Sequence, residues 1–282
     1  MSVGALMLIW IVGCSGILGG SFCKLLHEKN IPFFSTTKDQ ADITDLSALQ
    51  KIIQKKNPTH IINCAAYTEV EKAEEEEEKA FLVNSQGIAN LASVSRGKLI
   101  HFSTDYVFDG KKKTPYLEED DPCPINVYGK SKLAGEKILF KMKTNALCIR
   151  ISWLFGGEND FVSKILKLMN QKKSLSMVYD QIGVPCYAKD VAAFTLGMLE
   201  REGIYHYSSL ESSSWYEFAK EIFFLTNKKK SLLCEEIKPI VTKDFKTKAR
   251  RPLYSVLGSS KIHFQAKNPR TWKCALKEYI DG

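Results

Sequence analysis

Short, continuous apolar runs alternate with segments of helical spacing throughout the first half of this chain. The runs have the length of strands covered on both faces, and they lie at residues 8–12, 31–34, 61–64, 99–103 and 146–151. Between them, apolar residues recur every three or four positions at 17–29, 46–54 and 127–141. This β-α-β-α-β order predicts an α/β fold with a doubly wound parallel sheet.

The pattern becomes less regular after residue 152. Helical spacing is present at 161–170, 191–200 and 215–226, and the apolar run at 175–178 is typical of a strand. Ser213 and Ser214 are candidate caps for the last of these helices. We predict a larger sheet domain over 1–152, to which 175–200 returns a strand and a helix. The remainder of 153–282 should form mainly a smaller C-terminal domain, packed against the first.

Composition excludes several classes of protein. Hydrophobic residues make up 44% and charged residues 26% of the 282 positions, so extensive disorder is not expected. The formal net charge is +8, but the lysines are spread over the whole chain and no nucleic-acid-binding motif accompanies them. We therefore expect no nucleic-acid partner, and a positive balance that suits a small anionic ligand.

Neither the cysteines nor the acidic residues indicate a metal site. None of the eight cysteines forms a C-x-x-C pair, and the five acids at 74–78 are typical of a solvated helix face. Free cysteines at this density suit a reducing compartment. The apolar N-terminus is too short to span a bilayer and lacks the basic start of a signal peptide. We expect a cytoplasmic protein with no membrane partner.

A glycine-rich turn, GCSGILG at 13–19, follows the first predicted strand and opens the first helix. Gly13 allows a tight turn, Gly16 lets the backbone approach a pyrophosphate, and Gly19 permits close packing of helix on strand. The free N–H groups of the helix then face the anion. A purely structural turn is the alternative. We predict a Rossmann-type NAD(P)-binding domain whose turn residues are Gly13, Ser15, Gly16, Ile17, Leu18 and Gly19.

The end of the second predicted strand favours NADPH over NADH. An acid there would bind the ribose hydroxyls of NADH and repel the 2′-phosphate of NADPH. The sequence instead has Thr36 and Lys38, which could hold a phosphate. Asp42 and Ile43 are candidates for contacts to the adenine.

Tyr128 and Lys132 are four residues apart at the start of a predicted helix, so they share one face. A free tyrosine has a pKa near 10, and a neighbouring lysine cation would lower that pKa towards neutrality. The same lysine can hydrogen-bond the cofactor ribose. Ser103 and Thr104, at the end of the fourth predicted strand, could supply the hydroxyl that completes an acid–base set.

Six segments resemble the dTDP-4-dehydrorhamnose reductase family, a member of the extended short-chain dehydrogenase/reductase superfamily. They are NCAAYT at 63–68, STDYVFDG at 103–110, PINVYGKSKLAGE at 124–136, RISWLFG at 150–156, DQIGVP at 180–185 and ARRP at 249–252. The resemblance spans nearly the whole chain, and STDYVFDG is its most specific part.

The resemblance implies hydride transfer from NADPH or NADH to the C4 keto carbon of a nucleotide-linked 6-deoxy sugar, within dTDP-rhamnose and polysaccharide biosynthesis. By this resemblance Tyr128 gives a proton to the developing alkoxide, Thr104 hydrogen-bonds the same oxygen, and Lys132 tunes Tyr128. Ala65, Ala66, Tyr67 and Phe102 would line the cofactor together with Tyr128 and Lys132. Thr104, Asp105, Tyr106 and Trp153 would contact the sugar.

The resemblance leaves some properties open. Some family members carry a glutamate after the glycine turn that helps to hold magnesium between subunits, and Ser21 stands there in this chain. We therefore expect a monomer or a homodimer without that metal. Two alternatives remain: a reductase or epimerase of a UDP- or GDP-linked sugar, and a non-catalytic regulator similar to the β subunit of methionine adenosyltransferase.

Overall fold

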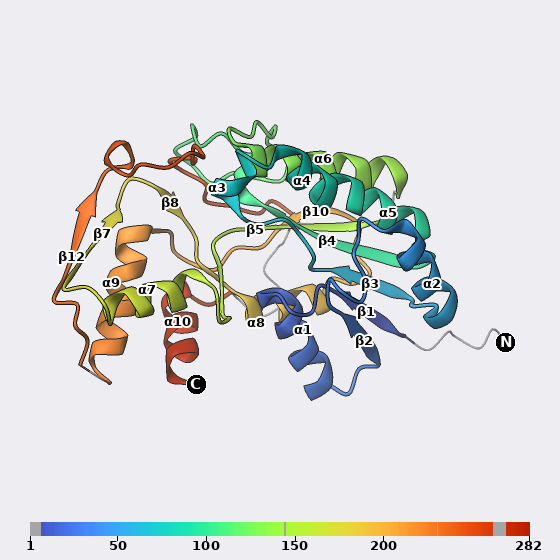
Figure 1. Ribbon diagram of the computed structural model, residues 1–282, viewed down its shortest axis with the longest axis horizontal. Coiled ribbons are helices and arrows are strands. Elements are labelled where there is room, and N and C mark those ends of the chain that lie inside the picture. Colours follow the sequence, from blue (N-terminus) through green and yellow to red (C-terminus); the bar gives the residue numbers. More distant parts are fainter. Residues whose placement is uncertain (1–6, 144, 230, 262–268) are drawn as a thin grey trace.

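A six-stranded parallel sheet forms the larger lobe of the computed structural model, which describes residues 7–143, 145–229, 231–261 and 269–282 (Figure 1). The strand order is β10-β5-β4-β3-β1-β2. The bounds are β1 Ile9–Val12, β2 Phe33–Thr36, β3 His60–Asn63, β4 Lys98–Thr104, β5 Leu147–Ile151 and β10 Gly203–His206. All five pairings are parallel, which confirms the predicted fold class.

Helices cover both faces of this sheet (Figure 1). On one face lie α1 (Ile17–Glu28) and α8 (Ala188–Leu196), packed on Ile9 and Ile11 of β1. Opposite them, Trp10 and Val12 contact the helices of the other face. The helices of that side are α2 Leu46–Lys56, α3 Val70–Ala73, α4 Glu77–Phe81, α5 Gly87–Val94 and α6 Val127–Met142. The central strands of the sheet are thus buried on both faces, which is why each of them is a continuous apolar run in the sequence.

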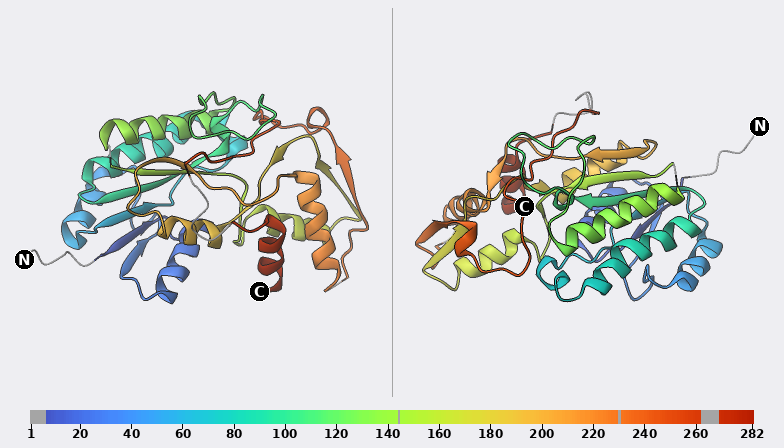
Figure 2. Two further views of the ribbon diagram at one scale, coloured as in Figure 1. Left: turned by 180° about the vertical axis from the view of Figure 1, so that it is seen from behind. Right: turned by 90° about the horizontal axis from the view of Figure 1, so that it is seen from above.

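The second lobe is smaller and has its own core (Figure 2). It contains α7 Phe161–Met169, α9 Trp215–Asn227 and α10 Trp272–Asp281, with the parallel pair β7 Ser174–Val178 and β12 Glu236–Ile240. Short pairs link the lobes: β6 Leu154–Phe155 with β9 Cys186–Tyr187, and β8 Ile182–Gly183 with β11 Ser213–Ser214. Ser214 caps α9 in a reciprocal box with Glu217.

The chain returns to the larger lobe later than the sequence suggests. Helix α8 packs against α1, but β7 pairs with β12 in the smaller lobe. The returning strand of the central sheet is instead β10, at Gly203–His206. Its four residues are only partly apolar and carry no strand pattern of their own, so tertiary pairing with β5 decides their conformation.

Helix α6 approaches its neighbour closely because Gly135 has no side chain. The neighbour is η1 (Leu82–Gln86), a five-residue π-helical turn between α4 and α5. A Cβ at Gly135 would lie 2.1 Å from the Asn84 carbonyl oxygen, which is backbone and cannot move alone. The close packing of α6 on η1 therefore depends on this glycine.

Replacing Gly135 with alanine should destabilise the protein by about 1–3 kcal/mol, because the overpacking outweighs alanine's helix preference of roughly 0.5–1 kcal/mol. Gly20→Ala, in α1, is the matched control, since its Cβ would meet only the Cys14 oxygen at 3.7 Å. It should be neutral or slightly stabilising. Chemical denaturation measures both variants, and equal effects would contradict the packing argument.

Candidate functional site

A cavity of about 240 Å³ opens at the carboxyl edge of the sheet, between the ends of β1 and β3. The strand order reverses at this point, because β2 lies on one side of β1 and β3 lies on the other. Ligands of doubly wound sheets bind at such a switch point. The lining residues are Gly13, Ser15, Gly16, Lys38, Ala41, Asp42, Ile43, Cys64, Ala65, Ala66, Tyr67, Lys79 and Val83.

The glycine turn is shaped to receive a phosphate group. Gly13 has φ +79°, and a Cβ there would lie 2.8 Å from the Ala65 nitrogen. A Cβ at Gly19 would lie 2.3 Å from the Gly13 oxygen, so that glycine lets α1 pack on the turn. Gly16 is the N-cap of α1 and provides no side-chain cap. The N–H groups of the first helical turn are therefore available to an anion.

Beyond β2, Lys38 supplies an exposed cation at the same cavity. Its side chain is 74% exposed, and its Nζ lies 3.9 Å from Asp42 Oδ2. Thr36 has another role: its hydroxyl accepts a hydrogen bond from the Trp10 indole at 3.0 Å. Its carbonyl accepts from the N–H groups of Gly13 and Cys14 and so fixes the turn.

The predicted cofactor residues divide into two groups. Nine of the sixteen line the cavity, and the seven that do not are Ile17, Leu18, Gly19, Thr36, Phe102, Tyr128 and Lys132. Leu18 and Phe102 lie in the core between the sheet and α1. The cavity also contains residues that sequence reasoning missed, namely Ala41, Cys64, Lys79 and Val83. Of these, only Cys64 lies in one of the six segments that resemble the reductase family.

At the end of β4, Thr104 connects two titratable side chains. Its hydroxyl donates to Asp105 Oδ1 at 3.0 Å and accepts from the Tyr106 N–H at 3.2 Å, and it lowers the pKa of Tyr128 against the effect of burial. Asn126 caps α6 by accepting from the Gly129 N–H at 2.7 Å, which fixes the turn that carries Tyr128. Ser103 does not compete for this role, since its buried hydroxyl has no hydrogen-bond partner among the described residues.

Burial raises the pKa of Tyr128 to about 12, and only the Thr104 hydrogen bond opposes this. Lys132 is not among the groups that shift this pKa. The Lys132 Nζ instead donates to the Phe102 carbonyl at 2.6 Å and lies 3.5 Å from His101 Nε2. Burial also lowers the pKa of Lys132 to about 8. Tyr128 consequently keeps its proton at neutral pH and suits the role of an acid.

Asn84, in the π-helical turn, ties α6 to the loop that follows β3. Its Oδ1 accepts from the Tyr67 N–H at 2.8 Å, and its Nδ2 donates to the Tyr67 carbonyl and to Ser131 Oγ. Ser131 in turn donates to the Tyr128 carbonyl. This buried amide therefore holds the cavity wall and the helix of Tyr128 in register, and no sequence motif indicated it. Such π-helical turns are frequent at functional sites.

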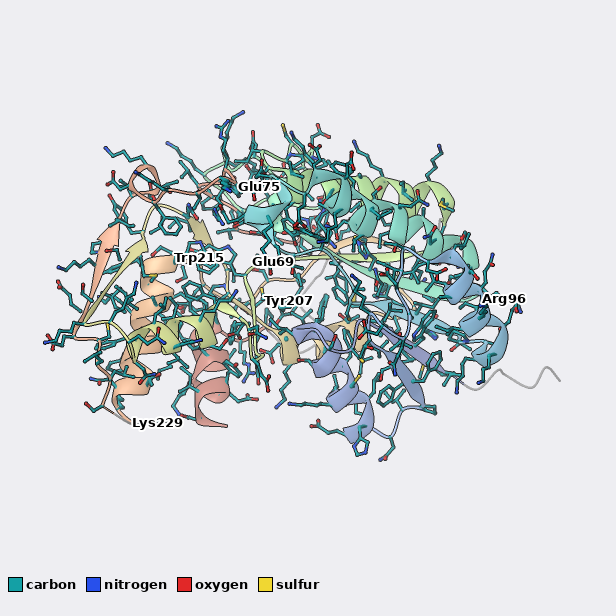
Figure 3. The ribbon with its side chains drawn as sticks, in the orientation of Figure 1. Glu69, Glu75, Arg96, Tyr207, Trp215 and Lys229 are labelled. Carbon is teal, nitrogen blue, oxygen red and sulfur yellow. The ribbon has the colours of Figure 1, made fainter. Side chains whose placement is uncertain are left out.

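Trp153 follows β5 and has a strained backbone, with φ +38°. Its ring stacks on Trp215 at 3.6 Å between centroids. Figure 3 places Trp215 on the side of the smaller lobe that faces the larger one. A Cβ at Gly183 would lie 2.4 Å from the Trp153 ring, so this glycine makes room for the indole. Backbone strain of this kind is frequent at functional sites, although Trp153 does not line the 240 Å³ cavity.

No group of three or more His, Cys, Asp or Glu side chains in the described ranges is placed to hold a metal ion. No helix in the same ranges is long and apolar enough to cross a membrane.

Comparison with known proteins gives matches over almost the whole chain. The family model described as RmlD substrate binding domain matches residues 7–282. The spore coat polysaccharide biosynthesis protein SpsK of Bacillus subtilis is 36% identical over 277 residues, which cover 96% of each chain. A dTDP-4-dehydrorhamnose reductase of Aggregatibacter actinomycetemcomitans is 38% identical over 283 residues, with 95% of this chain and 96% of the relative covered.

A solved structure extends this similarity to three dimensions. It is the dTDP-4-dehydrorhamnose reductase of Bacillus anthracis in complex with NADP. The TM-score is 0.92 at 34% identity, with 98% of this chain and 99% of that chain covered.

Proposed function

Because the chain belongs to the RmlD substrate binding domain family, we propose that it is an NADPH-dependent reductase of a nucleotide-linked 4-keto-6-deoxy sugar. The substrate we infer is dTDP-4-dehydro-β-L-rhamnose, which would be converted to dTDP-β-L-rhamnose for polysaccharide synthesis. Relatives named as dTDP-4-dehydrorhamnose reductases and as a dTDP-4-keto-6-deoxy-D-glucose reductase support this substrate class.

One observation carries the proposal. Tyr128, whose pKa is raised by burial, lies with Thr104 and the buried Lys132 at the carboxyl edge of β4. The adjacent β3 leads into the cavity that contains the glycine turn. An acid and a dinucleotide site at one edge of a sheet are what hydride reduction of a carbonyl requires.

The residues present fit the cofactor. The glycine turn and the uncapped α1 would hold the pyrophosphate, and Lys38 would hold a 2′-phosphate. When bound, the nicotinamide would supply the hydride for the keto carbon. Tyr128 would give its proton to the carbonyl oxygen, and Thr104 would hydrogen-bond that oxygen. Lys132 would stabilise the phenolate that Tyr128 leaves behind.

The sugar would lie between the two lobes, against Thr104, Tyr106 and Trp153. Tyr106 contacts the Tyr128 ring edge-on, with centroids 6.0 Å apart. Asp105 is only 2% exposed, and hydroxyl groups engage both of its oxygens. It would therefore reach the sugar only through Thr104. The proposal holds for a monomer or a homodimer, and it assigns the protein to the cytoplasm.

Lys38→Ala should weaken NADPH binding about fivefold to tenfold and leave NADH binding nearly unchanged, since it removes one exposed charge-assisted contact of roughly 1 kcal/mol. Fluorescence titration with each cofactor measures the two affinities. Lys55→Ala is the control, because Lys55 is exposed on α2 and does not line the cavity. An equal loss for both cofactors would contradict the assignment of the 2′-phosphate to Lys38.

A panel of dTDP-, UDP- and GDP-linked sugars in a thermal-shift assay tests the substrate class. A sugar present at 100 times its Kd stabilises the folded state by about 2.7 kcal/mol. We expect the dTDP-linked sugars to raise the melting temperature most. Preferential stabilisation by a UDP- or GDP-linked sugar would overturn the dTDP assignment while leaving the reductase chemistry in place.

A further inference from the structure

A series of aromatic contacts runs from the carboxyl edge of the sheet into the smaller lobe. The Trp153 ring stacks on the Trp215 ring, with centroids 3.6 Å apart and planes 7° apart. The Trp215 centroid lies 4.6 Å from that of Phe161, and Phe161 stacks on Phe218 at 5.3 Å. Phe218 is completely buried in the core of the smaller lobe. Trp153 is thus connected to that core through Trp215.

Trp153 lies at the same edge of the sheet as Thr104. Ile151, the last residue of β5, is paired in parallel with Thr104, the last residue of β4. Trp153 is two residues beyond Ile151, so the chain places it beside the end of β4. We assign the carbonyl oxygen of the sugar to Thr104, and an indole next to it offers the sugar an apolar surface and one N–H donor.

The backbone of Trp153 adopts a conformation that disfavours a residue with a Cβ. Its φ is +38°, and such a conformation persists where neighbouring groups hold it. The Cys186 N–H holds the backbone by donating to the Trp153 carbonyl at 3.1 Å. The side chain is held by the stack on Trp215, and Gly183 leaves room for the indole, since a Cβ there would lie 2.4 Å from the ring. The orientation of this indole therefore depends on its partner ring.

Trp215 is fixed in place by structure of its own. It is the first residue of α9, where Ser214 and Glu217 form the reciprocal capping box. The short strand β11, which directly precedes α9, pairs with β8. A ring that is attached to a capped helix and a paired strand is a rigid support, and it restrains the Trp153 indole before any ligand binds.

We propose that Trp215 is a positioning residue for the sugar, and that it holds the Trp153 indole in the orientation in which this ring contacts the substrate. This inference rests on the proposed reductase function, because the sugar is the group that Trp153 would contact. A preorganised ring binds its ligand without the entropic cost of ordering the side chain. Loss of Trp215 should therefore weaken the binding of the sugar and leave the binding of the nucleotide and the chemical step nearly unchanged.

Calorimetric titration with dTDP-β-L-rhamnose and with dTDP alone separates the sugar from the nucleotide. Trp215→Leu removes the stacked ring and should weaken binding of dTDP-β-L-rhamnose about tenfold, but that of dTDP less than about twofold. Trp215→Phe keeps a ring and should recover most of this loss. Tyr216→Leu is the control, because Tyr216 is the next residue of α9 and its ring contacts Lys220. It should bind both ligands as the wild-type protein does.

Two further measurements distinguish positioning from a general loss of structure. In steady-state kinetics, Trp215→Leu should raise KM for the keto sugar about tenfold and keep kcat within about twofold, as expected for a contact made equally in the ground and transition states. Near-ultraviolet circular dichroism of the free protein should show the coupled signal of two stacked indoles. This signal should vanish in Trp215→Leu and remain in Tyr216→Leu.

Three results would overturn the proposal. The first is unchanged affinity for dTDP-β-L-rhamnose in Trp215→Leu once the coupled signal is lost. The second is an equal loss for dTDP and dTDP-β-L-rhamnose, which would assign the ring pair to the nucleotide. The third is a fall in kcat without a rise in KM. A wild-type protein that neither binds dTDP-β-L-rhamnose nor reduces the keto sugar would instead contradict the proposed function itself.

Discussion

Tyr128→Phe should lower kcat by ~10²–10⁴-fold, because it removes the phenol that we propose as the general acid. The ring and its packing remain, so the affinity for NADPH should change little. Steady-state kinetics and a fluorescence titration of the cofactor measure the two effects separately. The raised pKa of Tyr128 adds a further expectation: loss of the tyrosine proton should not limit activity near neutral pH.

Tyr106→Phe is the matched control, since Tyr106 is the neighbouring phenol and contacts the Tyr128 ring edge-on. Arg251 lowers the pKa of this hydroxyl, and in the part of the chain that the structure describes no hydrogen bond joins it to the Thr104 side chain. We expect a loss of kcat below tenfold. Comparable losses in the two variants, or full activity in Tyr128→Phe, would remove Tyr128 from the role of acid.

Arg150→Met should destabilise the fold by about 3–5 kcal/mol, because it leaves a buried carboxylate without its partner. Arg150 on β5 donates to Glu136 on α6 through two nitrogens, at 2.9 and 2.7 Å. Their side chains are only 2% and 3% exposed. Arg150 also lies 3.3 Å from His206 Nε2 on β10, so the pair joins the helix of Tyr128 to two strands. Chemical denaturation measures the loss.

The double variant Arg150→Met, Glu136→Leu separates an unpaired charge from lost packing. Replacing both members of a buried ion pair by apolar groups is often close to neutral. The double variant should therefore recover most of the stability that Arg150→Met loses. If the double variant is as unstable as Arg150→Met, the loss of unfolding free energy comes from altered packing at β5 and not from the unpaired carboxylate.

Local patterns in the sequence predicted the parts of the site that neighbouring residues build. The glycine turn between β1 and α1, the strand that ends at Thr104, and the Asn126-capped helix of Tyr128 each lie within a short stretch of chain. Their apolar periodicity and turn chemistry are local properties, so the fold class and the cavity lining around the glycine turn could be predicted from them. Ala65, Ala66 and Tyr67, which also line the cavity, were predicted from the family resemblance. The family match confirms the resemblance on which the site residues were named.

The remainder depends on contacts between distant segments. Asn84 reaches Ser131 from 47 positions away, and Ser255 reaches Asp105 from 150. The four-residue spacing on one helix face predicted that Lys132 would lie near the Tyr128 hydroxyl. In the structure, the Lys132 ammonium group donates a hydrogen bond to the Phe102 carbonyl. The pKa of Tyr128 is likewise set by burial, which depends on how α6 packs on η1 and β4. None of these effects leaves a local signature in the sequence.

The most direct test of the proposed function is the oxidation of NADPH by the purified protein in the presence of dTDP-4-dehydro-β-L-rhamnose. Absorbance follows the cofactor, and chromatography identifies the sugar product. We predict stoichiometric formation of dTDP-L-rhamnose at the expense of NADPH, with Tyr128→Phe almost inactive under the same conditions. A protein that binds NADPH but reduces neither this sugar nor a related nucleotide-linked 4-keto sugar would contradict the proposed function and favour a regulatory role.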